Sequence, residues 1–192
     1  MTPSMILPIV VAGILGAFTW TLLEYCIHRW LGHDRRLMPN PFSAEHVIHH
    51  SQNHFAPAWK KALAAALFLV AITPPAILAV GLGPGVAYAV GLVGFYLVYE
   101  VVHLLVHVFR GIGPYGRWAR RHHFSHHFTD PRMNHGVTSP LWDVVFRTYL
   151  APGVIVVPEQ LRPEWLLDER GAVREAYATS YRLRRARSRG AA

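Results

Sequence analysis

The amino-acid sequence predicts an all-α integral membrane protein, a bundle of about three transmembrane helices, with four as the alternative, and a helical cap in the cytosol. Three observations support this fold class. Hydrophobic residues make up 52% of the chain and charged residues only 16%, which is too apolar for an average soluble domain. The apolar residues are concentrated in long segments. The basic residues lie between or after these segments.

The first apolar segment, residues 5–27, has Glu24 as its only charged residue. At a rise of about 1.5 Å per residue, a helix of this length crosses a hydrocarbon core of about 30 Å. The segment lacks the preceding basic residues and the following small-residue cleavage site of a secretory signal peptide. We therefore expect a transmembrane helix here.

The second apolar segment, residues 62–99, contains no charged residue and is interrupted by Pro74–Pro75 and by the glycine-rich stretch 81–85. Proline and glycine bend or end membrane helices. We therefore expect a helical hairpin, in which a helix near 61–80 with a proline kink is followed by a turn and a helix near 85–109.

The positions of Lys and Arg predict the orientation in the membrane. No basic residue precedes Arg29, and none lies between Lys61 and Arg110. If the hairpin crosses the bilayer and returns, every basic cluster lies on one face, which the positive-inside rule makes cytoplasmic. We expect a protein of the bacterial inner membrane whose basic residues contact anionic lipid and not nucleic acid.

The rest of the composition limits the domain organisation. The only cysteine, Cys26, excludes a disulfide framework and a cysteine-based zinc finger. A length of 192 residues suits one domain with an appended tail. We expect a membrane domain over residues 1–157 and a basic C-terminal tail over residues 158–192, which contains RLRRARSR at 182–189.

Histidine is the most informative residue type in the sequence. All 13 histidines lie between His28 and His135, and most fall into four groups: HRWLGH (His28, His33), HVIHH (His46, His49, His50), HLLVH (His103, His107) and HFSHH (His123, His126, His127). Residues three or four apart share a helix face, so the last three groups can each point one way. His28 and His33 diverge by roughly 140° on an ideal helix. They need a helix end or a bulge to converge, which Gly32 permits.

These groups predict metal binding. Clustered imidazolium ions repel one another, so most of the rings must be neutral, and a metal ion is the natural partner of a neutral imidazole. One ion takes about four to six ligands, so ten imidazoles favour two ions. The motifs of zinc proteases, serine hydrolases and phosphate-binding loops are absent from the sequence, which argues against those classes.

The segments EYCIHRWLGH, EHVIHH, YEVVHLLVH and HFSHH, followed by NHGVTSPLWD, resemble the fatty acid hydroxylase/sterol desaturase superfamily. The resemblance runs from about Glu24 to Phe146. The short third box is more similar to the fatty acid 2-hydroxylase branch than to bacterial carotenoid hydroxylases, which space it one residue wider. Members are integral membrane, non-haem di-metal oxygenases with a four-helix membrane part.

The resemblance implies an O2-dependent hydroxylase in lipid biosynthesis that acts on an acyl chain, a sterol-like ring or another isoprenoid lipid. It implies two irons, although zinc also suits imidazole. Two external electrons are needed. No cytochrome b5 domain precedes the first box, so we expect a separate ferredoxin or cytochrome b5-like donor. The histidines of the four groups match the family's metal ligands: His28, His33, His46, His49, His50, His103, His107, His123, His126 and His127.

Further residues are candidates around this site. His122 is an alternative to His123, His135 is a candidate ligand or proton relay, and His54 lies outside the box spacing. A ligating histidine usually donates its other N–H to a carboxylate or carbonyl. Four carboxylates near the boxes are candidates for that role: Glu24, Glu45, Glu100 and Asp143.

Other functions remain open at this point. A carotenoid ring hydroxylase of the same superfamily is one alternative. A membrane metal-binding or carrier protein without oxygenase activity is another, although a carrier needs ligands along a path and these histidines lie on one side. A scaffold that has lost its activity is a third.

Overall fold

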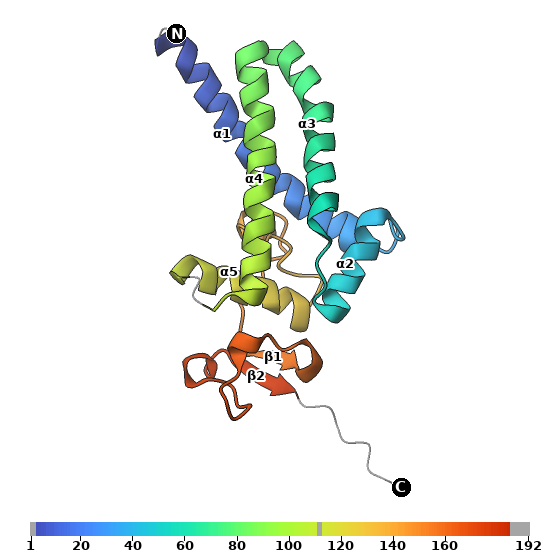
Figure 1. The fold of residues 1–192 in the computed structure, drawn as a ribbon, viewed down its shortest axis with the longest axis vertical. Helices are drawn as coiled ribbons and strands as arrows, with labels where there is room; N and C mark the ends of the chain where they lie inside the picture. The colour runs from blue at the N-terminus through green and yellow to red at the C-terminus, as the bar shows by residue number, and fades with distance from the viewer. Residues whose placement is uncertain (1–2, 111–112, 185–192) are drawn as a thin grey trace.

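The computed structural model describes residues 3–110 and 113–184 and is drawn in Figure 1. Its α-helices are α1 (Pro3–Cys26), α2 (Pro41–Gln52), α3 (Ala58–Val80), α4 (Leu82–Val108), α5 (Gly113–Phe128) and α6 (Leu141–Val145). Its strands are β1 (Ile155–Pro158) and β2 (Tyr181–Arg184), and three 3-10 helices span Glu159–Leu161, Glu164–Leu166 and Glu175–Tyr177. The predicted helical fold class is confirmed.

Three long helices form the upper part of the molecule in Figure 1, with α3 and α4 side by side as a hairpin and α1 crossing α4. Within the described residues, three segments are long and apolar enough to cross a membrane: Ile6–Gly32, Ala58–Val80 and Leu82–Val108. None of the residues of α3 is buried, although the helix is strongly apolar. An apolar surface of this size faces lipid in a membrane protein.

The hairpin turn is tighter than the sequence predicts. A single residue, Gly81, separates α3 from α4, with a φ of 87° that suits glycine. Pro84 lies in the first turn of α4 and not in the turn before it. Proline is tolerated there because the first N–H groups of a helix have no intrahelical partner. The glycine-rich stretch therefore belongs largely to the helix.

Close packing of α1 against α4 depends on two glycines. A Cβ atom on Gly91 would lie 2.0 Å from the carbonyl oxygen of Gly13, and one on Gly16 would lie 2.0 Å from that of Tyr88. Small residues allow two membrane helices to approach until their backbones touch. Further along the same interface, Trp20 packs with residues of α4 in a buried cluster that contains Leu92, Val93 and Tyr96.

The C-terminal part of the described chain forms a small subdomain below the helices in Figure 1. Strands β1 and β2 pair in parallel, and their apolar side chains pack on Phe124 of α5. The sequence analysis does not predict these strands, because four residues are too few for an alternating pattern to be recognised. The predicted boundary between residues 157 and 158 lies within β1. Residues 185–192 of the predicted tail lie outside the described residues.

This subdomain also closes the C-terminal end of α4. The last carbonyl groups of a helix have no intrahelical partner. The buried Arg120 of α5 donates from Nε to the carbonyl oxygen of Val106 at 2.8 Å, and Trp165 Nε1 donates to that of His107, also at 2.8 Å. The guanidinium of Arg120 lies 3.8 Å from the ring centroid of Trp165. The end of α4 is thereby fixed.

Gly91 and Gly94 of α4 have different surroundings, so replacing each of them with Ala tests the contact between α1 and α4. We expect Gly91→Ala to force α1 and α4 apart and to cost about 1–3 kcal/mol of stability, as overpacking does. Gly94→Ala should be neutral or slightly stabilising, because no atom lies within 4 Å of its added Cβ and Ala is the better helix former. Thermal unfolding of the purified proteins in detergent would measure both. Equal stability of the two variants would contradict the proposed contact.

Candidate metal centre

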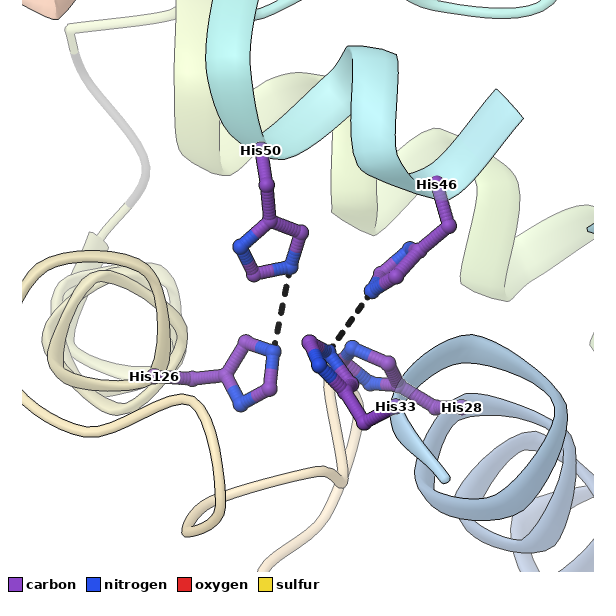
Figure 2. A group of neighbouring side chains, drawn as sticks. All are labelled: His28, His33, His46, His50 and His126. Atoms are coloured by element: carbon purple, nitrogen blue, oxygen red, sulfur yellow. Dashed lines mark hydrogen bonds between the residues drawn. The ribbon is translucent and has the colours of Figure 1, made fainter. Parts of the chain in front are cut away.

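Ten histidine side chains converge below the membrane helices in two groups of five. Site 1 consists of His28, His33, His46, His50 and His126. Site 2 consists of His49, His103, His107, His123 and His127. In each site, one nitrogen of every ring lies within 4.8 Å of the others. Figure 2 shows the rings of site 1 pointing toward one another from three directions. The ten histidines of the four sequence groups are thus brought together.

Each H-x-x-H-H segment contributes to both sites. In α2, His46 and His50 are four apart and point into site 1, whereas His49 points into site 2. In α5 the arrangement is reversed, with His123 and His127 in site 2 and His126 in site 1. The prediction that all three histidines of each group point one way is therefore wrong: residues four apart differ by about 40° around the helix, whereas the third histidine is about 100° from its direct neighbour. One helix can therefore place ligands in two adjacent sites.

The convergence of His28 and His33 requires a special backbone. The chain after α1 continues as a π-helical turn, Ile27–Gly32, so the predicted local bulge is confirmed. Because a π-helix closes i→i+5 hydrogen bonds, residues five apart come onto one side. The ring centroids of the two histidines are 5.3 Å apart. A Cβ on Gly32 would lie 3.0 Å from Cδ2 of His46, so the turn can pack this closely only with glycine.

The Nε2 atoms of the histidines form close pairs between different elements. His33 faces His46 at 2.8 Å and His50 faces His126 at 3.2 Å, both in site 1. In site 2, His49 faces His103 at 2.9 Å and His107 faces His123 at 3.0 Å. Two nitrogens bound to one ion at about 2.1 Å and at right angles lie about 3.0 Å apart. The spacing thus matches neighbouring ligands of one metal ion.

Backbone carbonyl groups fix the orientation of three of the rings. The Nδ1 atom of His28 lies 2.5 Å from the carbonyl oxygen of His135, and that of His126 lies 2.7 Å from that of Met133. The Nδ1 atom of His49 lies 3.0 Å from the carbonyl oxygen of His54. A carbonyl can only accept, so each Nδ1 carries the proton, and a neutral ring then presents a lone pair at Nε2.

Burial keeps these imidazoles neutral. Removal from water lowers the pKa of His33 to about 4 and that of His49 also to about 4. The pKa of His50 falls to about 2, first because of burial and then because of the neighbouring His33 and His49. The pKa values of His46 and His126 also lie well below the usual range. Near neutral pH these rings are therefore uncharged and can act as metal ligands.

Two buried carboxylates hold the loop that orients His28. The N–H groups of His135 and Gly136 donate to Asp143 at 2.8 Å each. Those of Val137 and Thr138 donate to Glu24 of α1 at 3.0 and 2.9 Å. Four successive backbone donors are thereby satisfied inside the protein. The carbonyl of His135 is held where it meets the imidazole of His28.

The four predicted carboxylates therefore use other partners than the ligand imidazoles. Glu24 and Asp143 act on the backbone of the loop, Glu45 pairs with Lys60, and Glu100 pairs with Lys61 at 2.5 Å. Among the described residues, their hydrogen bonds and ion pairs do not reach the ten histidines. Backbone carbonyls take the expected role instead. The sequence carries no signal for this, because every residue has a carbonyl group.

The three additional histidine candidates lie at the edge of the site. His122 is buried between the rings of Trp118 and Tyr149, and its Nε2 lies 3.1 Å from Asp143. That pairing holds the pKa of Asp143 below its usual value, although burial acts in the opposite direction. His54 contributes its carbonyl oxygen to the orientation of His49.

The third candidate, His135, lies closest to the metal centre. Its ring centroid is 5.3 Å from that of His126 and 5.5 Å from that of His28. Its Nε2 lies 3.0 Å from the carbonyl oxygen of Arg132, and its Nδ1 is buried without a hydrogen-bond partner among the described residues. The ring thus packs against site 1 with one free nitrogen.

An apolar cavity lies between the membrane helices, beside a smaller pocket that histidines line. It has a volume of about 440 Å³ and is lined by Trp20, Ile27, Phe68, Tyr96 and other residues of α1, α2, α3 and α4. A smaller pocket of about 80 Å³ shares Phe42, Tyr99 and Glu100 with this cavity and reaches His46, His49 and His103. A long apolar molecule in the cavity would have one end close to site 2 and to His46.

The residues present fit two metal ions. Several buried nitrogens have no hydrogen-bond partner among the described residues, including Nε2 of His28, Nδ1 of His123 and both ring nitrogens of His127. Buried polar atoms without partners are costly, and a cation in each site would satisfy one nitrogen of each ring around it. Five imidazoles per site, with lone pairs directed inward, are the ligands that iron, zinc and copper accept.

Comparison with known proteins shows which family this chain belongs to. The family described as "Fatty acid hydroxylase" matches residues 13–148. A ceramide very long chain fatty acid hydroxylase from Saccharomyces cerevisiae is 34% identical over 146 residues, which cover 72% of this chain and 38% of that protein. A dihydroceramide fatty acyl 2-hydroxylase from Arabidopsis thaliana is 32% identical over 152 residues, with 74% of this chain and 61% of that protein covered.

A solved structure agrees with the sequence comparison. The hydroxylase domain visible in the structure of full-length Scs7p superimposes with a TM-score of 0.58 and 28% sequence identity, and the match covers 75% of this chain and 57% of that chain. The chain thus spans only about two fifths of the length of the yeast relative. The resemblance predicted from the histidine groups is confirmed. The chain belongs to the fatty acid hydroxylase family, in the branch of the fatty acid 2-hydroxylases.

Proposed function

We propose that this protein is a membrane-bound, O2-dependent di-iron oxygenase that hydroxylates a lipid acyl chain at C2. The observation that carries the proposal is the pair of five-histidine sites beside an apolar cavity between membrane helices. The relatives that share this part of the chain are named as fatty acid and ceramide hydroxylases, which supports an acyl substrate. A scaffold without activity would not need ten neutral imidazoles in this arrangement.

In this proposal the five histidines of each site hold one iron. When bound, the two irons would supply the activation of O2, from which one oxygen atom enters the C–H bond and the other leaves as water. Two electrons and two protons complete this balance, and a separate ferredoxin or cytochrome b5-like protein is the proposed donor. Zinc in purified protein would reflect the preference of imidazole for both metals.

The protein itself positions the substrate and the histidine rings, and it excludes water from the reacting C–H bond. The cavity lined by Trp20 and Phe68 takes the acyl chain directly from the bilayer, so the lipid never crosses water. The carbonyls of His135, Met133 and His54 hold three rings in the tautomer that binds metal. Burial of the site keeps bulk water from the reacting C–H bond.

The placement in the cell is part of the same proposal. We propose that the histidine sites lie on the cytoplasmic face of the bacterial inner membrane, and the three candidate spans together with the one-sided basic clusters support this orientation. The N-terminus then lies on the opposite side from the C-terminus. We also propose that residues 1–157 form the hydroxylase domain and that the basic residues of 158–192 lie near anionic lipid.

Product and metal analysis together test the proposal. After expression in a lipid-rich host, lipids with an added hydroxyl group should accumulate and be detected by mass spectrometry. The gently purified protein should contain about two metal ions per chain, as ten imidazole ligands require. Metal without hydroxylated lipid would favour a metal-binding protein without oxygenase activity. Protein with only trace metal would overturn the proposal.

Substitution of one ligand separates catalysis from membrane insertion. His126→Ala should abolish hydroxylation and lower metal affinity at site 1 by at least about 100-fold, because Nε2 of His126 faces the other ligands. Insertion should be unchanged, because the apolar spans are untouched. His54→Ala should retain the metal, since His49 uses only the carbonyl oxygen of residue 54. Near-full hydroxylation by the His126 variant would show that the HFSHH box is structural and would overturn the enzyme proposal.

Gly32 provides a test that leaves every ligand in place. The Cβ of Gly32→Ala would press on the ring of His46, at 3.0 Å from Cδ2, and on Phe42 at 3.2 Å from Cε1. We expect roughly 10- to 100-fold weaker metal binding at site 1, comparable to the loss of a group that orients a ligand. Metal titration with Gly153→Ala as the control, where no atom lies within 4 Å of the added Cβ, measures this. Unchanged affinity would mean that contact with Gly32 does not position His46.

A further inference from the structure

The cavity and the pocket described above share three charged residues. The larger cavity is apolar along most of its length, and its charged groups are Glu24, Glu45, Lys60, Lys61 and Glu100. Three of these, Glu45, Lys61 and Glu100, also line the small pocket that reaches the histidines. Among the described residues that line the small pocket, Lys61 is the only permanent cation. It therefore lies between the apolar space and the candidate metal centre.

The ammonium group of Lys61 is held close to site 2. Its Nζ lies 2.5 Å from Oε2 of Glu100 and 5.5 Å from the ring centroid of Phe55. The Phe55 ring in turn packs on His49 with a centroid distance of 4.8 Å. The side chain of Lys61 is 23% exposed, so most of it is shielded from water. A partner for this cation is worth more here than at the open surface.

The neighbouring Lys60 provides an internal comparison. It pairs with Glu45, is 43% exposed, and lines the larger cavity without reaching the small pocket. Its ammonium also lies 5.7 Å from the ring centroid of Trp59. The two lysines thus have the same charge, adjacent positions and an acidic partner each. They differ in that only Lys61 lines the small pocket that reaches the histidines.

An acyl chain carries one strong hydrogen-bond acceptor, the carbonyl or carboxylate oxygen at its head. The tail suits the apolar cavity, but a head buried there without a donor would cost free energy. An ammonium group has only donors, so Lys61 can exchange its contact with Glu100 for one with a carbonyl oxygen. Glu100 therefore competes with the head of the substrate for the same cation.

We propose that Lys61 is the binding site for the carbonyl or carboxylate oxygen of a long acyl substrate, and that Glu100 occupies this cation until the substrate enters. The proposal rests on the proposed function and extends it to the position of the reaction. A head bound at Lys61 places the first carbons of the chain beside His49 and His103, so C2 is exposed to the metal centre. The distance from the bound head of the chain then determines which carbon is hydroxylated.

Binding measurements test the assignment without turnover. We expect metal-loaded protein in detergent to bind palmitic acid and an N-palmitoyl amide more tightly than cetyl alcohol, which has the same chain but no carbonyl group. Lys61→Met should weaken binding of the carbonyl ligands by roughly tenfold or more and leave the alcohol unchanged. Lys60→Met should keep the preference for the carbonyl ligands. A loss confined to palmitic acid would identify free fatty acids as the ligand, and a loss for both identifies any acyl carbonyl.

Glu100→Gln distinguishes a binding role from a structural ion pair. If the pair only stabilises the fold, loss of either partner should weaken ligand binding in the same way. If Glu100 competes with the substrate, Glu100→Gln should bind palmitic acid more tightly than the unaltered protein, opposite to Lys61→Met. Weaker binding in both variants, or no effect of Lys61→Met, would overturn the inference.

Product analysis keeps this inference separate from the proposed function. In cells, Lys61→Met should distribute the hydroxyl group over several carbons, whereas Lys60→Met should keep it at C2. Absence of hydroxylated lipid with the unaltered protein, together with the expected binding pattern, would refute the enzyme proposal and retain the carbonyl site. Hydroxylation at C2 only, with unchanged binding in Lys61→Met, would refute the carbonyl site and retain the enzyme proposal.

Discussion

The structure depends on the loop at residues 133–138 being held inside the protein by two carboxylates. Glu24 comes from the first membrane helix and Asp143 from the far side of the loop, and together they satisfy four successive N–H groups. The carbonyls of this loop orient His28 and His126, so these two histidines of site 1 are aligned by the backbone. The same bonds tie this loop to the first long helix.

The histidine sites connect elements that are distant in the sequence. Because each H-x-x-H-H helix contributes to both sites, imidazole rings join α2 and α5 to each other, to the end of the π-helical turn after α1 and to α4. Neutral imidazoles with inward lone pairs gain little from one another, so this part of the fold favours a bound cation. The capping of α4 by Arg120 and Trp165 then keeps His103 and His107 at the correct depth.

Several local features follow from the sequence because they depend on neighbours along the chain. The long apolar segments predict the membrane helices by length alone, and the spacing of His103 and His107 predicts a shared helix face. The five-residue separation of His28 and His33 predicts the bulge that the π-helical turn provides. The turn at Gly81 is shorter than the predicted glycine-rich turn, and the two strands are missed because four residues are too few for an alternating pattern to be recognised.

The sequence by itself determined the membrane helices, the ten candidate ligands and the expectation of two ions. Which histidines share an ion was decided only by tertiary structure, because a site is made by helices that are distant in the sequence and meet through packing. The same holds for Glu24 and Asp143, whose partners are N–H groups of a loop, and for Lys61, which lies at the end of a cavity made by four helices. Backbone donors and acceptors occur at nearly every residue, so only folding selects the ones that are used.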